Sequence, residues 1–284
     1  MNTSKLNITI VGLGLIGGSF AKAIRKYVPV KNLWAIDIDD SVLEKATKLG
    51  VIDKGFKDAT IPLKQSDLVI LCLYPSLTIK FMKENMSKFK SNAIITDTAG
   101  IKEKIIEEVM ESLREDLEFI GGHPMAGREC EGFDFSNENV FKEAQYILVR
   151  NKNNKVSSIS FFKDIIRKVK FKNIIEMSPA QHDEMVAFTS QLPHIIACVL
   201  MNNNLISGNF QCIGGSFKDA TRVAKINCGL WEELFMENKS HIVQQLRNFA
   251  DDMNKITNLI ENDERQDLRK LLNHGRNLRK EMDI

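Results

Sequence analysis

The sequence has few cysteines, and their spacing indicates no shared role. The five residues are Cys72, Cys130, Cys198, Cys212 and Cys228. They are odd in number, widely separated and never arranged as Cys-x-x-Cys. This pattern favours reduced thiols over a disulfide framework or a zinc site, so we expect no bound metal.

Neither sign of charge is in excess, and no signal segment precedes the first predicted strand. Lys and Arg number 39 against 37 for Asp and Glu, a net charge of +2. Charge therefore favours neither nucleic acid nor an anionic membrane surface. Met1 to Lys5 include no apolar region, and the apolar run Leu68 to Leu73 is far too short to span a bilayer. We expect a cytoplasmic protein with no nucleic-acid or membrane partner.

Two compositional halves divide the 284 residues. In the first, short β-branched runs alternate with amphipathic stretches, which is typical of β-α-β units in a parallel sheet. The predicted strands are Ile8 to Val11, Leu33 to Ile36, Leu68 to Leu73, Ala93 to Thr96, Glu118 to Ile120, Ala144 to Val149 and Asn173 to Met177. The second half has helical patterns at Pro179 to Ser207, Phe217 to Ala224, Leu230 to Ile260 and Glu264 to Met282. We predict an α/β domain over residues 1–176 and an all-helical domain over residues 177–284.

A glycine-rich turn, Gly12-Leu13-Gly14-Leu15-Ile16-Gly17, follows the first predicted strand and opens a helix. In that context it is the fingerprint of a Rossmann-type domain, in which a pyrophosphate approaches the backbone at the helix N-terminus. We expect the cofactor to contact Gly12, Gly14, Leu15, Ile16 and Gly17. Asp37 ends the next strand, where a carboxylate accepts ribose hydroxyls and repels a 2′-phosphate, so NAD is favoured over NADP. A solvated loop aspartate is the alternative.

The second motif is Gly121-Gly122-His123-Pro124-Met125-Ala126-Gly127. Imidazole exchanges a proton near neutral pH, and the flanking proline and glycines fix the backbone while leaving room for a ligand. The motif therefore predicts a base near the reactive end of the cofactor. A strand-to-loop turn with an incidental histidine remains the alternative.

Ligands of open α/β sheets lie beyond the carboxyl ends of the strands, so residues that follow the strands are candidates for binding. Tyr74-Pro75 follows one predicted strand, and Asp97-Thr98-Ala99-Gly100-Ile101-Lys102 follows the next. We expect Tyr74, Pro75 and Asp97 on the cofactor side. Lys102 is equally compatible with a solvated first helical turn and with a ligand contact.

The helical half contributes two further motifs. In Ser190-Gln191-Leu192-Pro193-His194 a proline interrupts an apolar helical pattern, which predicts a kink beside the histidine. The motif Gly214-Gly215-Ser216-Phe217-Lys218-Asp219-Ala220-Thr221-Arg222 enters a helix, and its arginine can grip a carboxylate or pair with Asp219. His182-Asp183 lies upstream, either paired with a cation or in an exposed helical turn.

Together these four motifs resemble the prephenate dehydrogenase family of tyrosine biosynthesis, which includes arogenate dehydrogenases. The resemblance implies a Rossmann-type NAD-binding domain, a helical domain that forms a homodimer, and oxidative decarboxylation of prephenate to 4-hydroxyphenylpyruvate. It implies that His123 takes the proton of the substrate hydroxyl, that His194 is a second catalytic and substrate-binding histidine, and that Arg222 grips a substrate carboxylate. Lys218 and Thr98 are expected beside the same small molecule.

Two positions depart from the family pattern. Gly100 stands where many relatives have a serine near the reacting hydroxyl, so that contact is missing or comes from Thr98 or water. Gln191 stands where histidine is frequent. The residues do not separate prephenate from arogenate. A β-hydroxyacid dehydrogenase of the 6-phosphogluconate type is disfavoured because it uses a lysine base, and an NAD-binding regulator is disfavoured because it needs no base.

Overall fold

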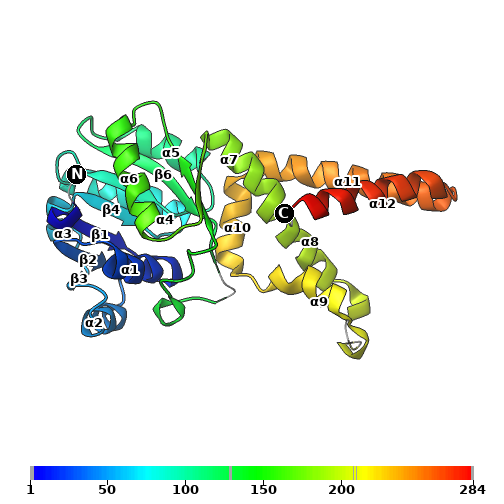
Figure 1. The fold of residues 1–284 in the computed structure, drawn as a ribbon, viewed down its shortest axis with the longest axis horizontal. Helices are drawn as coiled ribbons and strands as arrows, with labels where there is room; N and C mark the ends of the chain where they lie inside the picture. The colour runs from blue at the N-terminus through cyan, green and yellow to red at the C-terminus, as the bar shows by residue number, and fades with distance from the viewer. Residues whose placement is uncertain (1–2, 128–129, 207, 209, 283–284) are drawn as a thin grey trace. The chain divides into compact units, whose positions relative to one another are not determined.

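Eight strands form one sheet in the first compact unit of the chain, residues 1–238 (Figure 1). The computed structural model describes residues 3–127, 130–206, 208 and 210–282. The strands are β1 Asn7–Val11, β2 Asn32–Ile36, β3 Lys54–Phe56, β4 Leu68–Leu71, β5 Ile94–Asp97, β6 Glu118–Pro124, β7 Gln145–Val149 and β8 Asn173–Met177. Their order is β3-β2-β1-β4-β5-β6-β7-β8, and β1 to β6 are parallel. The predicted Rossmann-type α/β domain is confirmed.

The strand β4 lies between β1 and β5, and all four of its residues are buried. Its uninterrupted apolar sequence fits a strand covered on both faces. Seven of the observed strands overlap predicted ones. The exception is β3, whose Lys-Gly-Phe sequence contains no β-branched residue. It is held by its pairing with β2 rather than by a pattern of its own.

The strand β6 changes partner along its length. Its first half, Glu118 to Ile120, pairs in parallel with β5, whereas Gly121 to Pro124 pair antiparallel with β7. The strand therefore continues beyond its parallel pairing with β5. Gly121 to Pro124 form this extension of β6, and His123 lies on it opposite Ile147.

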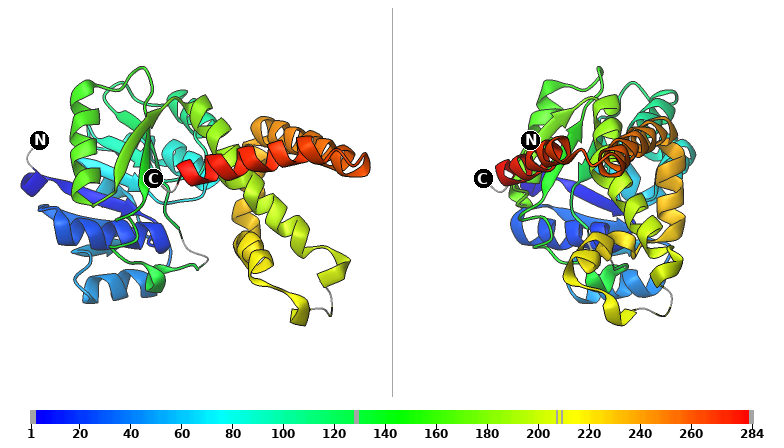
Figure 2. Two further views of the ribbon diagram at one scale, coloured as in Figure 1. Left: turned by 45° about the vertical axis from the view of Figure 1, so that its right-hand side comes forward. Right: turned by 90° about the vertical axis from the view of Figure 1, so that its right-hand side faces the viewer.

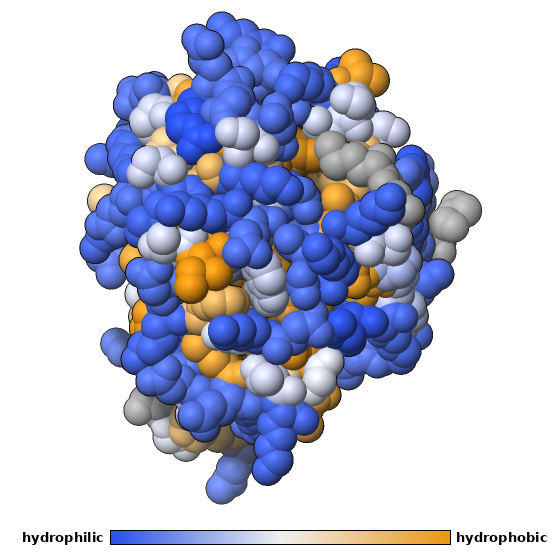
Figure 3. Space-filling view, turned by 90° about the vertical axis from the view of Figure 1, so that its left-hand side faces the viewer, coloured by the Kyte–Doolittle hydropathy of each residue, from blue (hydrophilic) through white to orange (hydrophobic). Residues whose placement is uncertain are grey.

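Helices cover both faces of the sheet, and each layer buries its own apolar cluster. Residues of α1 Leu15–Tyr27, α2 Asp40–Lys48 and α6 Val156–Lys168 belong to one cluster. Residues of α3 Thr60–Gln65, α4 Pro75–Asn85 and α5 Glu103–Met110 belong to the other. The face of this unit seen in Figure 3 is mostly hydrophilic with small separate apolar patches, as expected for a solvated layer.

The predicted helix Pro179 to Ser207 is divided in the structure. It consists of α7 Pro179–Val186, a π-helical turn Ala187–Gln191 and α8 Leu192–Met201. Pro193 lies in the first turn of α8, where a missing N–H is tolerated, so the irregularity falls in the turn before it. Short helices follow at α9 Gly215–Thr221 and α10 Cys228–Glu237.

The predicted helix Leu230 to Ile260 is also divided, because α10 ends at Glu237 and α11 Lys239–Glu261 begins after Asn238. The second compact unit, residues 239–284, contains α11 and α12 Arg265–Glu281. These two helices lie side by side as a hairpin (Figure 2). The helices α7 to α10 group with the sheet in the first unit, so the predicted functional boundary at residues 176 and 177 stays a prediction.

One described helical stretch, Pro179–Met201, is long and apolar enough to cross a membrane by length and composition. Its polar residues His182, Asp183 and Gln191 are almost fully buried in the first unit. Because these residues are bonded to other parts of that unit, we assign the stretch to the folded protein.

Candidate active site

The glycine motif forms a cradle between β1 and α1. Gly12 adopts a positive φ of 86°, and its N–H donates to the carbonyl of Ile36 at 2.8 Å. A Cβ built on Gly17 would lie 1.8 Å from the Gly12 carbonyl oxygen, so only glycine fits there. Gly14 caps α1 without a side chain, and a Cβ built on it meets no atom within 4 Å in the part of the chain that the structure describes.

This cradle fits a dinucleotide. The first turn of α1, which includes Leu15 and Ile16, leaves backbone N–H groups without an intrahelical acceptor. These groups and the helix dipole favour an anion such as a pyrophosphate. The open space beside Gly14 leaves the backbone accessible to it.

Asp37 lies directly beside the cradle. Its carboxylate accepts the Leu13 N–H at 2.6 Å and the Asp39 N–H at 3.0 Å, which fixes its orientation at the end of β2. A carboxylate has about four acceptor positions, so further acceptor capacity remains for ribose hydroxyls. Asp39 instead caps α2 by accepting the Ser41 N–H, which makes Asp37 the better candidate.

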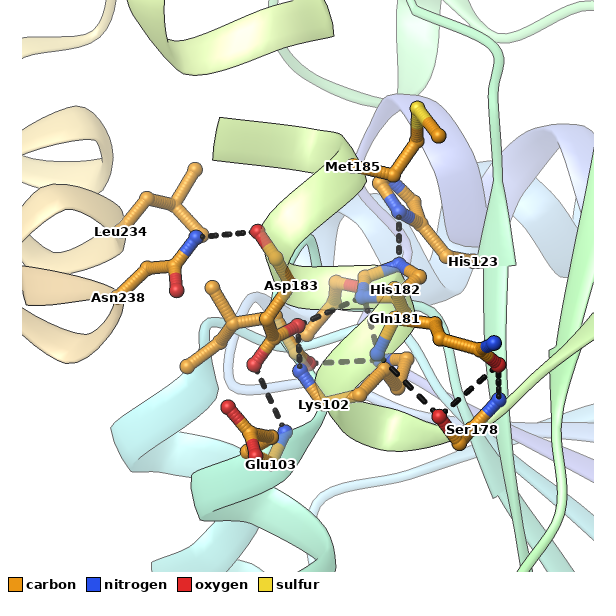
Figure 4. Close-up of polar contacts among 12 residues, drawn as sticks. Lys102, Glu103, His123, Ser178, Gln181, His182, Asp183, Met185, Leu234 and Asn238 are labelled. Carbon is orange, nitrogen blue, oxygen red and sulfur yellow. Dashed lines mark hydrogen bonds and ion pairs between the residues drawn. The ribbon is translucent and has the colours of Figure 1, made fainter. Parts of the chain in front are cut away.

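The histidine loop is anchored by its glycines. A Cβ built on Gly122 would lie 1.9 Å from the Tyr146 hydroxyl oxygen, so any larger residue would displace this tyrosine. The next residue, His123, is partly buried and points toward α7 (Figure 4). Its Nδ1 lies 2.8 Å from Nε2 of His182.

His182 and Asp183 extend this contact into a chain of hydrogen bonds. Nδ1 of His182 lies 2.6 Å from Oδ1 of Asp183. The same carboxylate accepts the backbone N–H groups of Lys102 at 2.8 Å and Glu103 at 2.9 Å. All three donors surround one carboxylate, which orients it toward the imidazole of His182.

These contacts select one tautomer for each neutral histidine. A carboxylate only accepts hydrogen bonds, so the Nδ1–H of His182 donates to Asp183 and its Nε2 accepts. His123 must then donate through its own Nδ1–H to that acceptor. Nε2 of His123 is consequently unprotonated and able to accept a proton.

The surroundings keep both imidazoles neutral. Burial is the main cause that lowers the pKa of His123 well below 6.5, and the nearby His182 and Lys102 lower it further. Burial also lowers the pKa of His182, although the hydrogen bond to Asp183 acts in the opposite direction. A base that is neutral at physiological pH is thereby available at the site.

Lys102 is completely buried and supports the loop after β5. Its Nζ donates to the Asp97 carboxylate at 2.5 Å and to the carbonyls of Ala99 and Ile101 at 2.8 and 2.9 Å. The sequence left two roles open for Lys102, a solvated residue of a helical turn or a ligand contact. The structure matches neither, because all three N–H donors of the ammonium group bind acceptors within the protein.

Asp97 is also fully buried. Its carboxylate accepts the Lys102 ammonium, the Ala99 N–H at 3.0 Å and the Gly122 N–H at 3.2 Å. The expected cofactor contact of this side chain stays a prediction. What the geometry displays is a link between the loop after β5 and the backbone next to His123.

A pair of buried amides holds the other side of Asp183. Asn238 donates through Nδ2 to the Asp183 carbonyl and to Oε1 of Gln191, both at 2.9 Å. Gln191 in turn donates to the carbonyl of Leu234 at 3.0 Å. Gln191, noted in the sequence as a departure from the family pattern, therefore joins α10 to the segment that carries His182.

The remaining predicted residues lie on several elements. His194 stacks on Trp231 with ring centroids 3.8 Å apart, and its Nδ1 lies 2.7 Å from the Ser190 carbonyl. Lys218 on α9 and Arg222, which follows this helix, are exposed. The structure thus joins His123 to His182 and Asp183 by hydrogen bonds, while Lys218 and Arg222 are exposed residues of a different segment.

The predicted residues that follow β4 and β5 have separate contacts. Tyr74 caps α4, and its hydroxyl accepts Nδ2 of Asn227 at 3.0 Å. Pro75 is the buried first residue of α4. The hydroxyl of Thr98 donates to the Leu71 carbonyl at 3.3 Å and keeps acceptor capacity for a further partner.

Sequence reasoning missed the central role of His182 and Asp183. An adjacent His-Asp pair gave a signal, and the helix signal Ser178-Pro179 preceded it, since Ser178 and Gln181 form a capping box on α7. The sequence did not indicate whether the first turn of α7, which carries His182 and Asp183, is buried or exposed. Only the fold brings α7 against the extension of β6.

Comparison with known proteins identifies relatives along almost the whole chain. The family model described as prephenate dehydrogenase, nucleotide-binding domain, matches residues 20–175. The model described as prephenate dehydrogenase, dimerization domain, matches residues 178–274. The prephenate dehydrogenase of Bacillus subtilis is 31% identical over 274 residues, which cover 94% of this chain and 74% of the relative.

Solved structures agree with these matches. A prephenate dehydrogenase from A. aeolicus in complex with hydroxyphenyl propionate and NAD+ is 29% identical, with a TM-score of 0.91 over 99% of this chain and 100% of that one. Synechocystis arogenate dehydrogenase is 26% identical, with a TM-score of 0.85 over 97% and 99% of the two chains. Both the order of the domains and the fold of the two halves are therefore shared.

Proposed function

Because the chain belongs to the prephenate dehydrogenase family, we propose that it oxidises prephenate with NAD and releases CO2 and 4-hydroxyphenylpyruvate. The observation that carries this proposal is the hydrogen-bonded series His123, His182 and Asp183 at the end of β6. It supplies an oriented neutral base at the sheet edge where ligands of such folds bind.

Residues of the cradle support NAD as the cofactor. Gly12, Gly14 and Gly17 would hold its pyrophosphate at the start of α1, and Asp37 would accept the ribose hydroxyls. When bound, NAD supplies an acceptor for a hydride. The A. aeolicus relative was solved with NAD+, which supports the same choice over NADP.

The proposed reaction begins at the ring carbon of prephenate that bears the hydroxyl. Nε2 of His123 accepts the hydroxyl proton while the hydride of that carbon leaves, so carbonyl character develops there. The bond to the ring carboxylate then breaks, its electron pair enters the ring and CO2 departs. Aromatisation drives this step.

His182 and Asp183 stabilise the proton that His123 acquires. As His123 becomes an imidazolium, its Nδ1–H still donates to His182, which donates to the Asp183 carboxylate. The negative charge of Asp183 therefore acts through one intervening imidazole. The two backbone donors on this carboxylate keep it in place during the proton transfer.

The helical residues complete the proposed substrate site. Arg222, which is exposed, would grip one of the two carboxylates, because a guanidinium can donate two parallel N–H bonds to a carboxylate. His194, already oriented by Trp231, would contact the substrate as the second catalytic histidine. Thr98 and Lys218 would supply further polar contacts.

We also propose a cytoplasmic homodimer formed through the helical part. The second matched domain is described as a dimerization domain. Apolar side chains exposed along the π-helical turn and α8 include Phe188 at 58% and Val199 at 64%, a pattern that a partner subunit would cover. Sedimentation of the purified chain at micromolar concentration measures this state directly, and a monomeric mass would contradict the proposal.

Absorbance of the reduced nicotinamide decides the main proposal. Purified protein is given prephenate or arogenate, each with NAD or NADP. We expect the highest kcat/KM with prephenate and NAD. The likeness to Synechocystis arogenate dehydrogenase makes arogenate, which would yield tyrosine directly, the second candidate. Absence of turnover with both substrates would contradict the enzymatic proposal.

A further inference from the structure

Gly100 faces the side chain of Leu234 and the ring of His123. A Cβ built on this glycine would lie 3.2 and 3.6 Å from the two methyl carbons of Leu234, and 4.0 Å from Cε1 of His123. Gly100 is not among the glycines with positive φ, so its backbone does not require glycine. The limiting factor at this position is space.

Leu234 is held firmly in that space from its other side. It is 8% exposed and belongs to the apolar cluster that also contains Ala99 and Ile101. Its carbonyl accepts Nε2 of Gln191 at 3.0 Å and the backbone N–H of Asn238 at 3.2 Å. These bonds orient α10 so that the methyl groups of Leu234 lie over Gly100.

We propose that Leu234 fills the volume of the side chain absent at position 100 and forms an apolar wall beside Cε1 of His123. This inference rests on the proposed function, in which His123 is the base. In this arrangement Leu234 is a positioning residue, because it acts on the reaction only through His123. Without a hydroxyl at position 100, proton transfer depends on Nε2 of His123 and its orientation by His182.

The wall has a direct electrostatic consequence. An apolar group against an imidazole keeps water from that edge and disfavours the charged form. Burial is the largest cause that lowers the pKa of His123, and the charges of His182 and Lys102 lower it further. In the proposed arrangement Leu234 is one of the groups that produce this burial, because its methyl groups and Cε1 of His123 border the same space beside Gly100. Replacing Leu234 by alanine leaves both charged groups in place, so the proposal predicts a change in the pKa of His123 through burial.

The first experiment measures imidazole titration by NMR in the free protein, so it does not depend on turnover. The His123 signal is identified by its absence in His123→Asn. In Leu234→Ala we expect the pKa of His123 to rise by about one unit as water reaches the ring. The matched control is Leu230→Ala, one turn earlier on α10 and packed on the same cluster, which should leave the titration unchanged. An unchanged pKa in Leu234→Ala would overturn the proposal.

The second experiment is a double-mutant cycle at positions 100 and 234. Gly100→Ser should lower kcat by about tenfold, because its Cβ presses on Leu234. In the double variant Gly100→Ser with Leu234→Ala, the serine occupies the vacated volume, and kcat should recover at least about threefold over Gly100→Ser alone. Strictly additive losses would overturn the proposal.

The two experiments distinguish failure of the Leu234 proposal from failure of the proposed function. Should wild-type protein fail to turn over prephenate, the proposed function is contradicted, while the titration still tests Leu234. If turnover is normal but the titration of Leu234→Ala equals that of wild type, only the wall is contradicted. Leu234→Met, which conserves volume, should retain both the wild-type titration and kcat, and thereby distinguish loss of the wall from misfolding.

Discussion

Nδ1 of His123 and Nε2 of His182 lie 2.8 Å apart, which joins a strand of the cofactor-binding sheet to the first turn of α7. The rings are inclined at 62°, so the contact is made edge to edge through nitrogen atoms rather than by stacking. Because Asp183 fixes the tautomer of His182, this single contact also decides which nitrogen of His123 is the base.

Replacing His123 tests the base directly. We expect His123→Asn to lower kcat with prephenate by about 10²- to 10⁴-fold, since an asparagine amide does not accept the hydroxyl proton as an imidazole does. The NAD dissociation constant, measured by fluorescence titration, should stay near its wild-type value because the cradle at Gly12 to Gly17 is unaffected. Retained turnover would exclude His123 from this role.

Asp183→Asn tests the hydrogen-bonded series of His123, His182 and Asp183, which we call the relay. An asparagine carries an NH2 group and no negative charge, so it no longer selects the tautomer of His182 and no longer stabilises an imidazolium at His123. We expect kcat to fall by about 10²- to 10⁴-fold with a smaller change in KM.

The matched control for Asp183→Asn is Asp134→Asn, which removes an exposed carboxylate paired with Lys45. It should leave kcat unchanged. A wild-type kcat in Asp183→Asn would show that the relay has no part in proton transfer.

The two lowered imidazole pKa values predict how stability depends on pH. Unfolded histidine titrates near 6.5, whereas His123 and His182 titrate lower in the folded protein. As the pH falls from about 6.5 toward the folded pKa values, the unfolded state binds protons first, so the free energy of unfolding decreases.

Thermal unfolding at several pH values measures this effect. The midpoint temperature should decline more steeply below pH 6.5 in wild-type protein than in His123→Asn. The control His274→Asn, on exposed α12, should keep the wild-type slope. Equal slopes in all three proteins would contradict the assignment of this destabilisation to the buried pair.

A matched pair of glycine variants separates folding from cofactor binding. In Gly17→Ala the new methyl group would lie 1.8 Å from the Gly12 carbonyl oxygen, so we expect a lower midpoint temperature and loss of NAD binding. In Gly14→Ala no atom of the described residues lies within 4 Å of the methyl group, and the midpoint should change by no more than about 2 °C. The methyl group should nevertheless weaken NAD binding by roughly tenfold, because it occupies the space beside the helix N-terminus. Unchanged NAD affinity in Gly14→Ala would place the pyrophosphate elsewhere.

Arg222→Ala tests the predicted carboxylate clamp. Loss of a bidentate contact that persists from bound substrate to transition state should raise KM for prephenate by tenfold or more, with a smaller effect on kcat. Lys225→Ala, an exposed cation three residues later, is the control and should keep the wild-type KM. A KM that is unchanged in Arg222→Ala would point to another anchor for the carboxylate.

The sequence predicts best what depends on local pattern. The uninterrupted apolar run predicted β4 correctly, and the spacing of the glycines predicted the turn between β1 and α1. Both features depend mainly on residues that are adjacent in the sequence. The strand β3 was missed because pairing with β2, rather than its three residues, makes it extended.

The site was predictable only in part for the same reason. His123 was identified from its flanking glycines and proline. Its partner His182 is 59 positions away, and Lys102 contacts Asp183 across 81 positions. Such contacts depend on how α7 packs on the sheet, which residue spacing does not encode. The burial of Lys102 was missed because its counterion Asp97 becomes enclosed only in the folded chain.

Because β6 changes partner along its length, β7 and β8 can separate from the sheet without unfolding the strands that bind the nucleotide. Among the described strands, His123 pairs through its backbone with β7 alone, whereas the strands beside the cradle are paired among themselves. Partial release of β7 and β8 would free the base from the relay and leave the nucleotide half of the sheet intact. Amide hydrogens on the extension of β6 should therefore exchange with solvent together with those of β7, and mild denaturant should abolish turnover at a concentration where the chain still retains NAD.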